Sequence, residues 1–512
     1  MLIKVFGAAV QGIDATLITI EVNSSRGCMF YLVGLPDSAV KESHQRIISA
    51  LQVNGYKMPT SNIVINMAPA DIRKEGSAYD LPLAIGMLGA SEVIQSDKLS
   101  KYLLMGGLSL DGSLHPVKGV LPIAIKAREL GFEGMIVPFS NAREAAVVNN
   151  LKVYGVNNLK EVIEFFNEKR ELSPTQVNTR EEFYAQQSNF DLDFAEVKGQ
   201  ENVKRALEVA AAGSHNILLV GAPGSGKSML AKRLPSILPP LSLGESLETT
   251  KIHSVAGKLG RDGGLISKRP FRDPHHTIST VAMTGGGSFP QPGEISLAHN
   301  GILYLDELPE YNRSVLEVLR QPLEDRKITV ARIKCNVEYP ASFMLVASMN
   351  PCPCGYYNHP TKACVCSPGQ VQKYLNRISG PLLDRIDLQI EVTPLPFEKM
   401  SDNHPGESSA TIRERVMRAR QIQEKRYADI PGVYCNAQMS SKLLSLYARP
   451  DEKGLTLLKN AMNRLNLSAR AYDRILKVSR TIADLEGCEA IQPSHLAEAI
   501  GYRNLDREDW AG

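Results

Sequence analysis

The segment that most constrains this chain is a glycine-rich run of eight residues that follows a short apolar stretch, residues 217–220. The run fits the pattern G-x-x-x-x-G-K-[ST] and consists of Gly221, Ala222, Pro223, Gly224, Ser225, Gly226, Lys227 and Ser228. A helix-like sequence follows at residues 229–234. A strand, a glycine-rich loop and a helix in this order form a P-loop, whose backbone N–H groups and helix N-terminus surround phosphate oxygens. We therefore predict a nucleoside triphosphate site in which Lys227 reaches the β- and γ-phosphates and Ser228 holds Mg²⁺.

The composition of the chain is that of a globular protein of several domains. It has 512 residues, 43% of them hydrophobic and 22% charged, and this length suggests about three domains. The net charge of +3 neither requires nor excludes a nucleic-acid partner. The sequence contains no run of 18 apolar residues, so we expect no membrane span. Eight cysteines in so long a chain do not suggest a secreted disulfide scaffold, and we expect a cytoplasmic location.

Polar segments divide the chain into three predicted domains of an α/β protein. Residues 1–165 alternate apolar strands with short helices, and the strands are expected at 17–22, 63–66 and 134–138. A polar linker is expected at 166–190. Strands and helices alternate again over residues 191–398, which predicts a parallel sheet with helices on both faces. Residues 399–512 are predicted to be helical, because apolar residues recur there at helical spacing.

A second acidic motif follows the P-loop by about 80 residues. Four apolar residues, 302–305, are followed by Asp306 and Glu307. This Walker B pattern places a carboxylate at the end of a buried strand, where Asp306 would complete the Mg²⁺ site and Glu307 would polarise the attacking water. A strand that ends in a solvated acidic turn is the alternative, and the upstream P-loop disfavours it.

Two further residues are candidates for the reaction. Asn350 ends a third apolar strand, residues 343–348, and could orient the water or touch the γ-phosphate. An Asn in a turn before Pro351 is the ordinary alternative. Arg385 lies between Asp384 and Asp387 and could form a surface ion pair or act in trans as an arginine finger on the phosphate of a neighbouring subunit. The second role requires a ring or a filament.

Four of the eight cysteines lie within fifteen residues. They are Cys352, Cys354, Cys364 and Cys366, with the spacing C-x-C-x₉-C-x-C. Four converging thiolates favour a tetrahedral Zn²⁺ site, although C-x-C is tighter than the common C-x₂₋₄-C. A redox role and a metal-free loop remain as alternatives.

The motifs together resemble those of the bacterial Mg-chelatase-like AAA+ ATPases of the ComM/YifB family, and the resemblance covers essentially the whole chain. Besides the P-loop, the Walker B run, Asn350 and the Leu-Leu-Asp-Arg sequence ending at Arg385, the matching segments are 197–201, 274–279, 285–288, 292–301 and 350–355. The resemblance implies ATP and Mg²⁺ as cofactors, a homo-oligomeric, hexameric ring and contact with recombination proteins. It also implies a DNA helicase that drives branch migration in natural transformation.

The same resemblance suggests roles for two arginines, Arg385 and Arg470, of which Arg470 lies at a predicted helix start. It gives Arg385 the finger role and Arg470 the role of a lid sensor that contacts the γ-phosphate. Arg474 lies one turn later on the same helix face and is a rival for that role.

Basic residues in two segments are candidates for DNA contact through the phosphate backbone. Residues 326–340 alternate in the manner of a β-hairpin and contain Lys327, Arg332 and Lys334. A second insertion, residues 258–287, contains Lys268 and Arg269. Such contacts would not depend on base sequence and would weaken with salt. Solvated strand edges with protective lysines are the alternative for the hairpin.

The first domain resembles the ChlI-type domain, which implies the ribosomal-S5-like fold of the catalytic domain of Lon protease. The matching segments are 74–80 and 107–117. Lon-type proteolysis needs a Ser nucleophile and a Lys base. In this sequence the nucleophile position falls near Ala78, with Ser77 one place away, and the base position falls near Leu121, with Lys118 out of register. We expect a domain without protease activity that binds DNA or a partner.

The leading prediction is therefore an ATP-dependent DNA motor. Three other functions share its ATPase residues: a metal-chelatase subunit, an ATP-dependent Lon-like protease and an AAA+ assembly factor.

Overall fold

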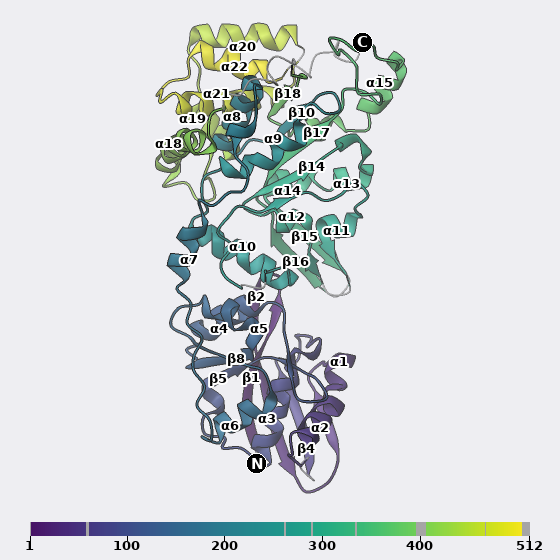
Figure 1. The fold of residues 1–512 in the computed structure, drawn as a ribbon, viewed down its shortest axis with the longest axis vertical. Coiled ribbons are helices and arrows are strands. Elements are labelled where there is room, and N and C mark those ends of the chain that lie inside the picture. Colours follow the sequence, from purple (N-terminus) through teal and green to yellow (C-terminus); the bar gives the residue numbers. More distant parts are fainter. Residues whose placement is uncertain are drawn as a thin grey trace. The chain divides into compact units, whose positions relative to one another are not determined.

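The computed structural model describes residues 2–57, 61–260, 263–287, 290–332, 335–395, 406–465 and 467–503. The chain divides into two compact units (Figure 1). Unit 1 contains residues 1–186 and 243–267, and unit 2 contains residues 187–242 and 268–512. None of the helices in the described ranges combines the length and the apolar character that a membrane span requires.

Unit 1 is built on a seven-stranded mixed sheet with the strand order β3-β4-β2-β1-β5-β8-β9. β1 and β2 form a long antiparallel pair, and β5, β8 and β9 continue in parallel from β1. The strands are β1 (Leu2–Gln11), β2 (Asp14–Ser25), β3 (Phe30–Val33), β4 (Asn62–Ala68), β5 (Tyr102–Leu104), β8 (Gly134–Pro138) and β9 (Lys152–Val156); β6 (Gly107–Leu108) and β7 (Leu114–His115) form a separate short pair. Strands occur at all three places expected from the sequence.

The helices of unit 1 are α1 (Ser38–Lys41), α2 (Ser43–Val53), α3 (Asp80–Ala90), α4 (Val120–Glu129), α5 (Phe139–Ala146), α6 (Leu159–Phe166), α7 (Thr179–Gln186) and α10 (Leu243–Ala256). Of these helices, α3, α4, α5 and α6 pack against the sheet. Every residue of α3 is buried, which agrees with its almost wholly apolar sequence. Helix α7 lies within the segment expected to be a linker, and its Phe183 is buried.

Helix α10 comes from the middle of the ATPase sequence, yet it packs against α4 of unit 1. The side chains of Leu247 and Leu265 contact the core of this unit. Ser254 donates a hydrogen bond to the buried carboxylate of Glu144, and its carbonyl accepts one from the backbone of Gly119 (3.1 Å). Burial raises the pKa of Glu144, while the hydrogen bond from Ser254 opposes this rise. This contact could not be predicted from local sequence patterns, because the partners lie more than 100 residues apart.

Unit 2 contains a five-stranded parallel sheet with the strand order β11-β14-β17-β10-β18. The strands are β10 (Ile217–Val220), β11 (Phe271–Arg272), β14 (Ile302–Leu305), β17 (Met344–Met349) and β18 (Leu388–Glu391). The central strands β10, β14 and β17 are buried throughout. This is the parallel sheet expected from the continuous apolar runs, and the α/β fold class is confirmed.

Helices and two hairpins surround this sheet. The helices are α8 (Glu201–Gly213), α9 (Lys227–Arg233), α11 (Thr280–Thr284), α12 (Glu294–Leu297), α13 (Arg313–Glu317), α14 (Arg320–Asp325), α15 (Pro368–Leu375) and α16 (Gly380–Leu383). One hairpin pairs β12 (Gly285–Gly286) with β13 (Gln291–Pro292), and the other pairs β15 (Lys327–Arg332) with β16 (Cys335–Pro340). The second hairpin lies where alternation in the sequence predicted it.

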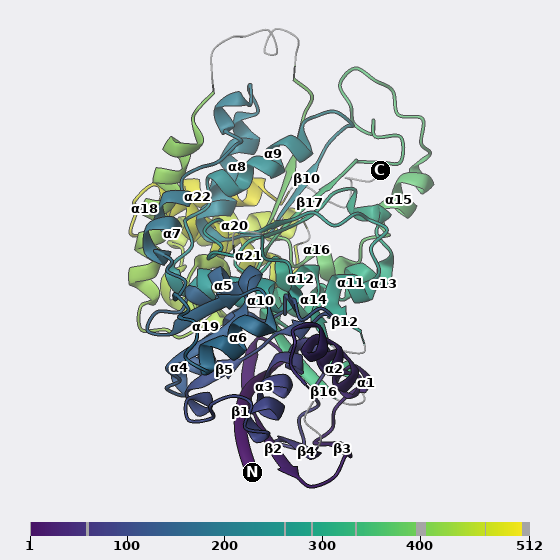
Figure 2. The same cartoon turned by 60° about the horizontal axis from the view of Figure 1, so that its bottom comes forward.

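The C-terminal part of unit 2 is helical, as expected, and packs against α8 through α18 and α21 (Figure 2). Its helices are α18 (Ser409–Tyr427), α19 (Ser441–Tyr447), α20 (Glu452–Arg464), α21 (Ala469–Leu485) and α22 (Pro493–Gly501). The apolar stripe read from the sequence faces the core, because Ile412, Val416, Ile475 and Ile482 are all buried.

Candidate functional site

The P-loop connects the end of β10 to the start of α9, as the motif predicted. Gly224 and Gly226 have φ values of 77° and 93°, a left-handed conformation that side chains disfavour. The ammonium group of Lys227 donates to the carbonyl oxygens of Gly221 (2.7 Å) and Ala222 (3.0 Å). Burial lowers the pKa of Lys227, although the charge of Asp306 opposes this effect. The lysine thus lies folded onto its own loop, within reach of a phosphate bound there.

Asp306 lies directly after β14 and faces the P-loop. The hydroxyl of Ser228 donates to its carboxylate (2.9 Å), and the hydroxyl of Ser348 donates to its other oxygen. Burial acts to raise the pKa of Asp306, but the hydrogen bonds from Ser348 and Ser228 outweigh this and lower it. The carboxylate is therefore ionised at neutral pH. A hydroxyl beside an ionised carboxylate is an oxygen ligand pair suited to Mg²⁺.

Glu307 follows in a left-handed conformation, with φ of 54°. Its side chain is 56% exposed, and its carboxylate lies 3.8 Å from Nδ1 of His276. His276 also contacts the ring of Tyr311, whose hydroxyl donates to the carbonyl of Pro274 (2.5 Å). An exposed carboxylate beside the P-loop can activate water. The Pro274–His276 sequence was noted as a family motif, but nothing in it revealed the contact with Glu307.

Asn350 follows β17, the strand between β10 and β14. Its side-chain oxygen accepts a hydrogen bond from Lys227 (3.2 Å). Lys227, Ser228, Asp306 and Asn350 therefore meet at the carboxyl ends of three adjacent parallel strands. Ligands of open parallel sheets bind at this edge.

Arg385 lies at the opposite end of the same sheet, beside the amino ends of its strands. It precedes β18, whose first residue, Leu388, pairs with the first residue of β10. A strand of this length spans about 13 Å, so Arg385 is separated from the P-loop of its own chain by the length of the sheet. Its guanidinium is buried and forms an ion pair with Glu324 (2.5 Å), and its Nε has no hydrogen-bond partner. Action on this chain's own nucleotide is thus excluded by position.

Arg470 and Arg474, the two candidates for the lid sensor, lie near the same amino end of the sheet. Arg470 is 62% exposed at the start of α21, with its guanidinium 3.6 Å from Asp384. Arg474 is largely buried and pairs with Asp387 (2.9 Å). Asp387 also lies 3.7 Å from the ring of His215, and both side chains are fully buried. Arg474 is therefore committed to a buried ion pair, whereas Arg470 projects into solvent.

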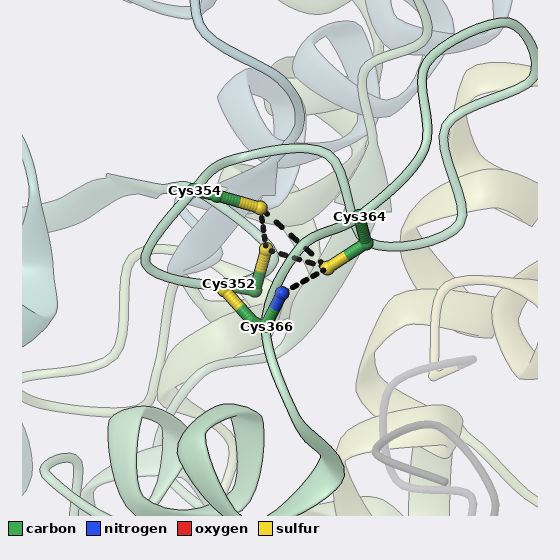
Figure 3. A group of neighbouring side chains, drawn as sticks. All are labelled: Cys352, Cys354, Cys364 and Cys366. Carbon is green, nitrogen blue, oxygen red and sulfur yellow. Dashed lines mark hydrogen bonds between the residues drawn. The ribbon is translucent and has the colours of Figure 1, made fainter.

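The four cysteines lie together in the loop between β17 and α15 (Figure 3). We call residues 352–366 the cysteine knuckle. Cys352 Sγ lies 3.3 Å from Cys354 Sγ and 3.7 Å from Cys364 Sγ, and the last two sulfurs are 3.5 Å apart. All four sulfurs lie within 4.8 Å of one another. Tetrahedral Zn–S bonds of about 2.3 Å would place sulfurs about 3.8 Å apart, so this donor set fits Zn²⁺.

The thiols of the knuckle differ in acidity. Burial acts to raise the pKa of Cys354, but backbone N–H groups of Tyr356 and Val365 outweigh this and lower it to about 6. At Cys364, a hydrogen bond from the backbone of Cys366 acts to lower the pKa, but burial and the neighbouring sulfurs outweigh it and raise the pKa. A lowered thiol pKa favours the thiolate, which is the form that binds metal ions.

The candidate DNA residues lie in different surroundings. Lys327, half exposed on β15, pairs with Glu338 of β16 (2.9 Å). Lys268 lies over the ring of Phe190. Arg269 donates to the backbone carbonyls of Pro239, Pro240 and Asn300, which engages its guanidinium in the fold. The side chain of Arg332 and all of Lys334 lie outside the described residues.

At the positions aligned with the proteolytic residues, the described residues Leu121 and Lys118 make other contacts. Leu121 is buried in α4, and its backbone donates to Glu144 (3.0 Å). The side chain of Lys118 lies against Gly257 instead. Lys74, in the 74–80 motif, is fully buried and donates to the carbonyls of Gly34 (2.9 Å) and Pro69. Burial lowers the pKa of Lys74. The sequence motif around Lys74 thus serves packing in this structure.

Comparisons with known proteins cover nearly all of the chain. Residues 193–400 match the family described as magnesium chelatase, subunit ChlI. Residues 20–141 match the family described as subunit ChlI of Mg-chelatase, and residues 406–503 match its C-terminal family.

Three relatives illustrate the similarity. The competence protein ComM of Haemophilus influenzae is 44% identical over 98% of this chain and 97% of its own length. The YifB protein of Escherichia coli is 43% identical over 98% of this chain and 96% of its own. The magnesium-chelatase 38 kDa subunit of Rhodobacter capsulatus is 24% identical over 59% of this chain and 84% of its own. Taken with the P-loop geometry, these similarities show that the chain belongs to the ComM/YifB family of Mg-chelatase-like AAA+ ATPases.

Proposed function

We propose that the protein is an ATP-driven DNA motor that works as a hexameric ring and promotes branch migration of incoming DNA in natural transformation. The observation that carries the proposal is the separation between the two ends of the unit 2 sheet. The P-loop and the acidic pair lie at one end, and Arg385 lies at the other. A complete hydrolysis site therefore needs a second chain, and a ring supplies one at every site.

In this proposal the residues around the P-loop perform ATP hydrolysis. Lys227 neutralises the β- and γ-phosphates, and Ser228 and Asp306 hold Mg²⁺. Glu307 polarises the attacking water, and Asn350 orients it. Arg385 of the next subunit then stabilises the charge that develops in the transition state. For the lid sensor we favour Arg470, because Arg474 is already paired with Asp387. Arg470 lies 3.6 Å from Asp384, at the same end of the sheet as Arg385, so it too would act on the phosphate of a neighbouring subunit.

The DNA role is supported by two observations. The relative from Haemophilus influenzae is named a competence protein. The β15–β16 hairpin of unit 2 presents Lys327 at a half-exposed position, where its ion pair with Glu338 could exchange for a phosphate contact. Of the basic candidates we retain Lys327 and Lys268 first, since Arg269 is engaged by backbone carbonyls.

We further propose that Cys352, Cys354, Cys364 and Cys366 hold a structural Zn²⁺. Four thiolate ligands close the coordination shell, so the ion would supply conformational stability and no open position for catalysis. Metal analysis of the purified full-length chain tests this point. A zinc content near one ion per chain is expected.

The decisive experiment measures movement of a branched DNA junction, and DNA-stimulated ATP hydrolysis, for the wild type and for Glu307→Gln. The wild type should move the junction with ATP, and the variant should bind both ATP and DNA without moving it. Lys327→Ala should weaken DNA binding and reduce its salt dependence, and the charge-preserving Lys327→Arg serves as its control. If the wild type hydrolyses ATP at the same rate with and without DNA and does not move the junction, the proposal of a DNA motor is wrong.

A further inference from the structure

The cysteine knuckle lies directly against the P-loop. Gly355, the residue after Cys354, has φ of 84° and meets the ring of Pro223. A Cβ atom added at Gly355 would lie 2.4 Å from Cδ and 2.7 Å from Cγ of that proline. Any side chain at this position would collide with the P-loop, so the knuckle backbone itself is the packing surface for Pro223.

Beyond this contact, the two segments face one another across an open pocket of about 230 Å³. Val220, Gly221 and Ala222 line it on the P-loop side, and the stretch from Tyr357 to Pro360 lines it on the knuckle side. The segment that follows β18, including Thr393, completes the wall. The cysteine knuckle therefore lies beside the first half of the P-loop and contacts it through Gly355 and Pro223.

Regular secondary structure does not hold the knuckle in place, because residues 350–367 form neither helix nor strand. The four sulfurs come from its two halves, with Cys352 and Cys354 in the first and Cys364 and Cys366 in the second, so a metal ion bound to them would cross-link the halves. Gly355 is covalently next to one of these sulfur-bearing residues. Its position against Pro223 therefore depends on whether the four cysteines are drawn together.

We infer that metal occupancy of the cysteine knuckle controls the nucleotide affinity of the P-loop through the contact between Gly355 and Pro223. This inference rests on the proposed metal site. With the metal bound, the knuckle supports the P-loop in its phosphate-binding conformation. Without it, the loop samples other conformations, and the observed affinity falls in proportion to the competent fraction. No knuckle residue needs to touch the nucleotide.

The test uses the full-length chain and a fluorescent ATP analogue, with bound metal measured in parallel. The variant Cys364→Ser should lose the metal and bind the analogue about tenfold more weakly, as a competent fraction of about one tenth implies. Removal of metal from the wild type with a chelator should weaken binding equally, and added Zn²⁺ should restore it. Zn²⁺ should not restore the affinity of Cys364→Ser for the analogue. If added Zn²⁺ restores the affinity of the chelated wild type, the loss on chelation was not caused by misfolding.

A glycine pair separates the contact from the metal. Gly355→Ala should weaken binding of the analogue although all four cysteines remain. Gly369→Ala, at the start of α15, should have no effect, because a Cβ there meets nothing within 4 Å. A metal-free chain that binds the analogue as tightly as the metal-bound wild type would overturn the inference and leave the zinc site intact. A purified wild type without metal would instead overturn the zinc site, and the inference with it.

Discussion

The two ends of the parallel sheet in unit 2 differ in how their charged groups are paired. At the carboxyl end, Lys227 and Glu307 have weak or replaceable partners, the carbonyls of their own loop and a histidine 3.8 Å away. At the amino end, Asp387 is fully buried and paired with Arg474, and Arg385 is paired with Glu324. The charged groups at the carboxyl end are therefore available to bind a ligand, whereas those at the amino end already form ion pairs within the chain. The difference indicates that the buried ion pairs at the amino end stabilise the fold. In the proposed ring this end would also supply Arg385 to a neighbouring chain.

The largest effect is expected from Arg385→Ala. If Arg385 acts on the phosphate of the next subunit, the turnover number for ATP should fall about 10³-fold or more. Nucleotide binding should change little, because Arg385 is remote from its own P-loop. Steady-state hydrolysis and a binding assay with a fluorescent ATP analogue measure the two quantities.

Mixing variants sharpens this prediction. Arg385→Ala mixed with Glu307→Gln should regain part of the activity, because some sites then combine an intact finger with an intact acidic pair. Glu324→Gln is the matched control, since it removes the partner of Arg385 and leaves the arginine. Equal loss of activity in this control and in Arg385→Ala would assign the pair a structural role.

The carboxyl end should respond to Glu307→Gln with a fall in the turnover number of about 10²- to 10³-fold. ATP binding should survive, because Glu307 holds neither Mg²⁺ nor phosphate in the proposed site. Isothermal titration with ATP and a hydrolysis assay together distinguish loss of chemistry from loss of binding. Unchanged hydrolysis would remove Glu307 from the mechanism.

Disrupting the buried ion pair of Asp387 with Arg474 should lower the stability of the fold rather than the rate of ATP hydrolysis. Replacing Asp387 by Asn leaves Arg474 without its buried counter-ion and should lower the free energy of unfolding by about 3 kcal/mol or more. Chemical denaturation of the wild type and the variant measures this difference. The exposed pair of Arg470 with Asp384 provides the control, because Asp384→Asn should cost less than about 1 kcal/mol.

The stability difference between the wild type and Asp387→Asn should depend on pH. Burial acts to raise the pKa of Asp387, but the charge of Arg474 and the contact with His215 outweigh it and lower the pKa well below its usual range. A carboxyl group with a depressed pKa stabilises the fold above its unfolded pKa of about 4, and this stabilisation is lost as the pH falls further. The stability difference between wild type and Asp387→Asn should therefore be constant from pH 7 to about 5 and shrink below about pH 4. A difference that grows with acidity would contradict this sign.

The smallest effect is expected from His276→Ala. The side chain lies 3.8 Å from Glu307 and is one-third exposed. Exposed pairs of this kind contribute up to about 1 kcal/mol, so turnover should fall by no more than about fivefold. His276→Gln is the matched control, because it retains a polar side chain at this position. A fall of more than about a hundredfold would place His276 in the chemistry itself.

The sequence predicted those features that depend on neighbouring residues or on the ends of parallel strands. The P-loop is a local strand–loop–helix motif, and Asp306 and Asn350 follow buried strands that could be recognised from their apolar runs. The convergence of these residues follows from the parallel sheet. The cysteines were grouped by short spacing alone, and their sulfurs do lie together.

Contacts between distant segments could not be predicted in this way. Nothing in the sequence near Arg385 specifies Glu324, and nothing near His276 specifies Glu307. The packing of α10 on α4 is the clearest case, because the apolar spacing of a helix shows that one face is buried but not which surface covers it. Domain boundaries read from polar segments have the same limit and remain predictions.

The assignment of α10 to unit 1 has a practical consequence for dissecting the protein. The polypeptide passes from one compact unit to the other three times, after Gln186, Ser242 and Ser267. No single cut separates the units. A fragment ending at Gln186 would lack a helix of its own core, and a fragment beginning at Gln187 would retain that helix with Leu247 and Leu265 uncovered. Work on the isolated ATPase therefore requires replacing residues 243–267 by a short loop as well as removing the N-terminus.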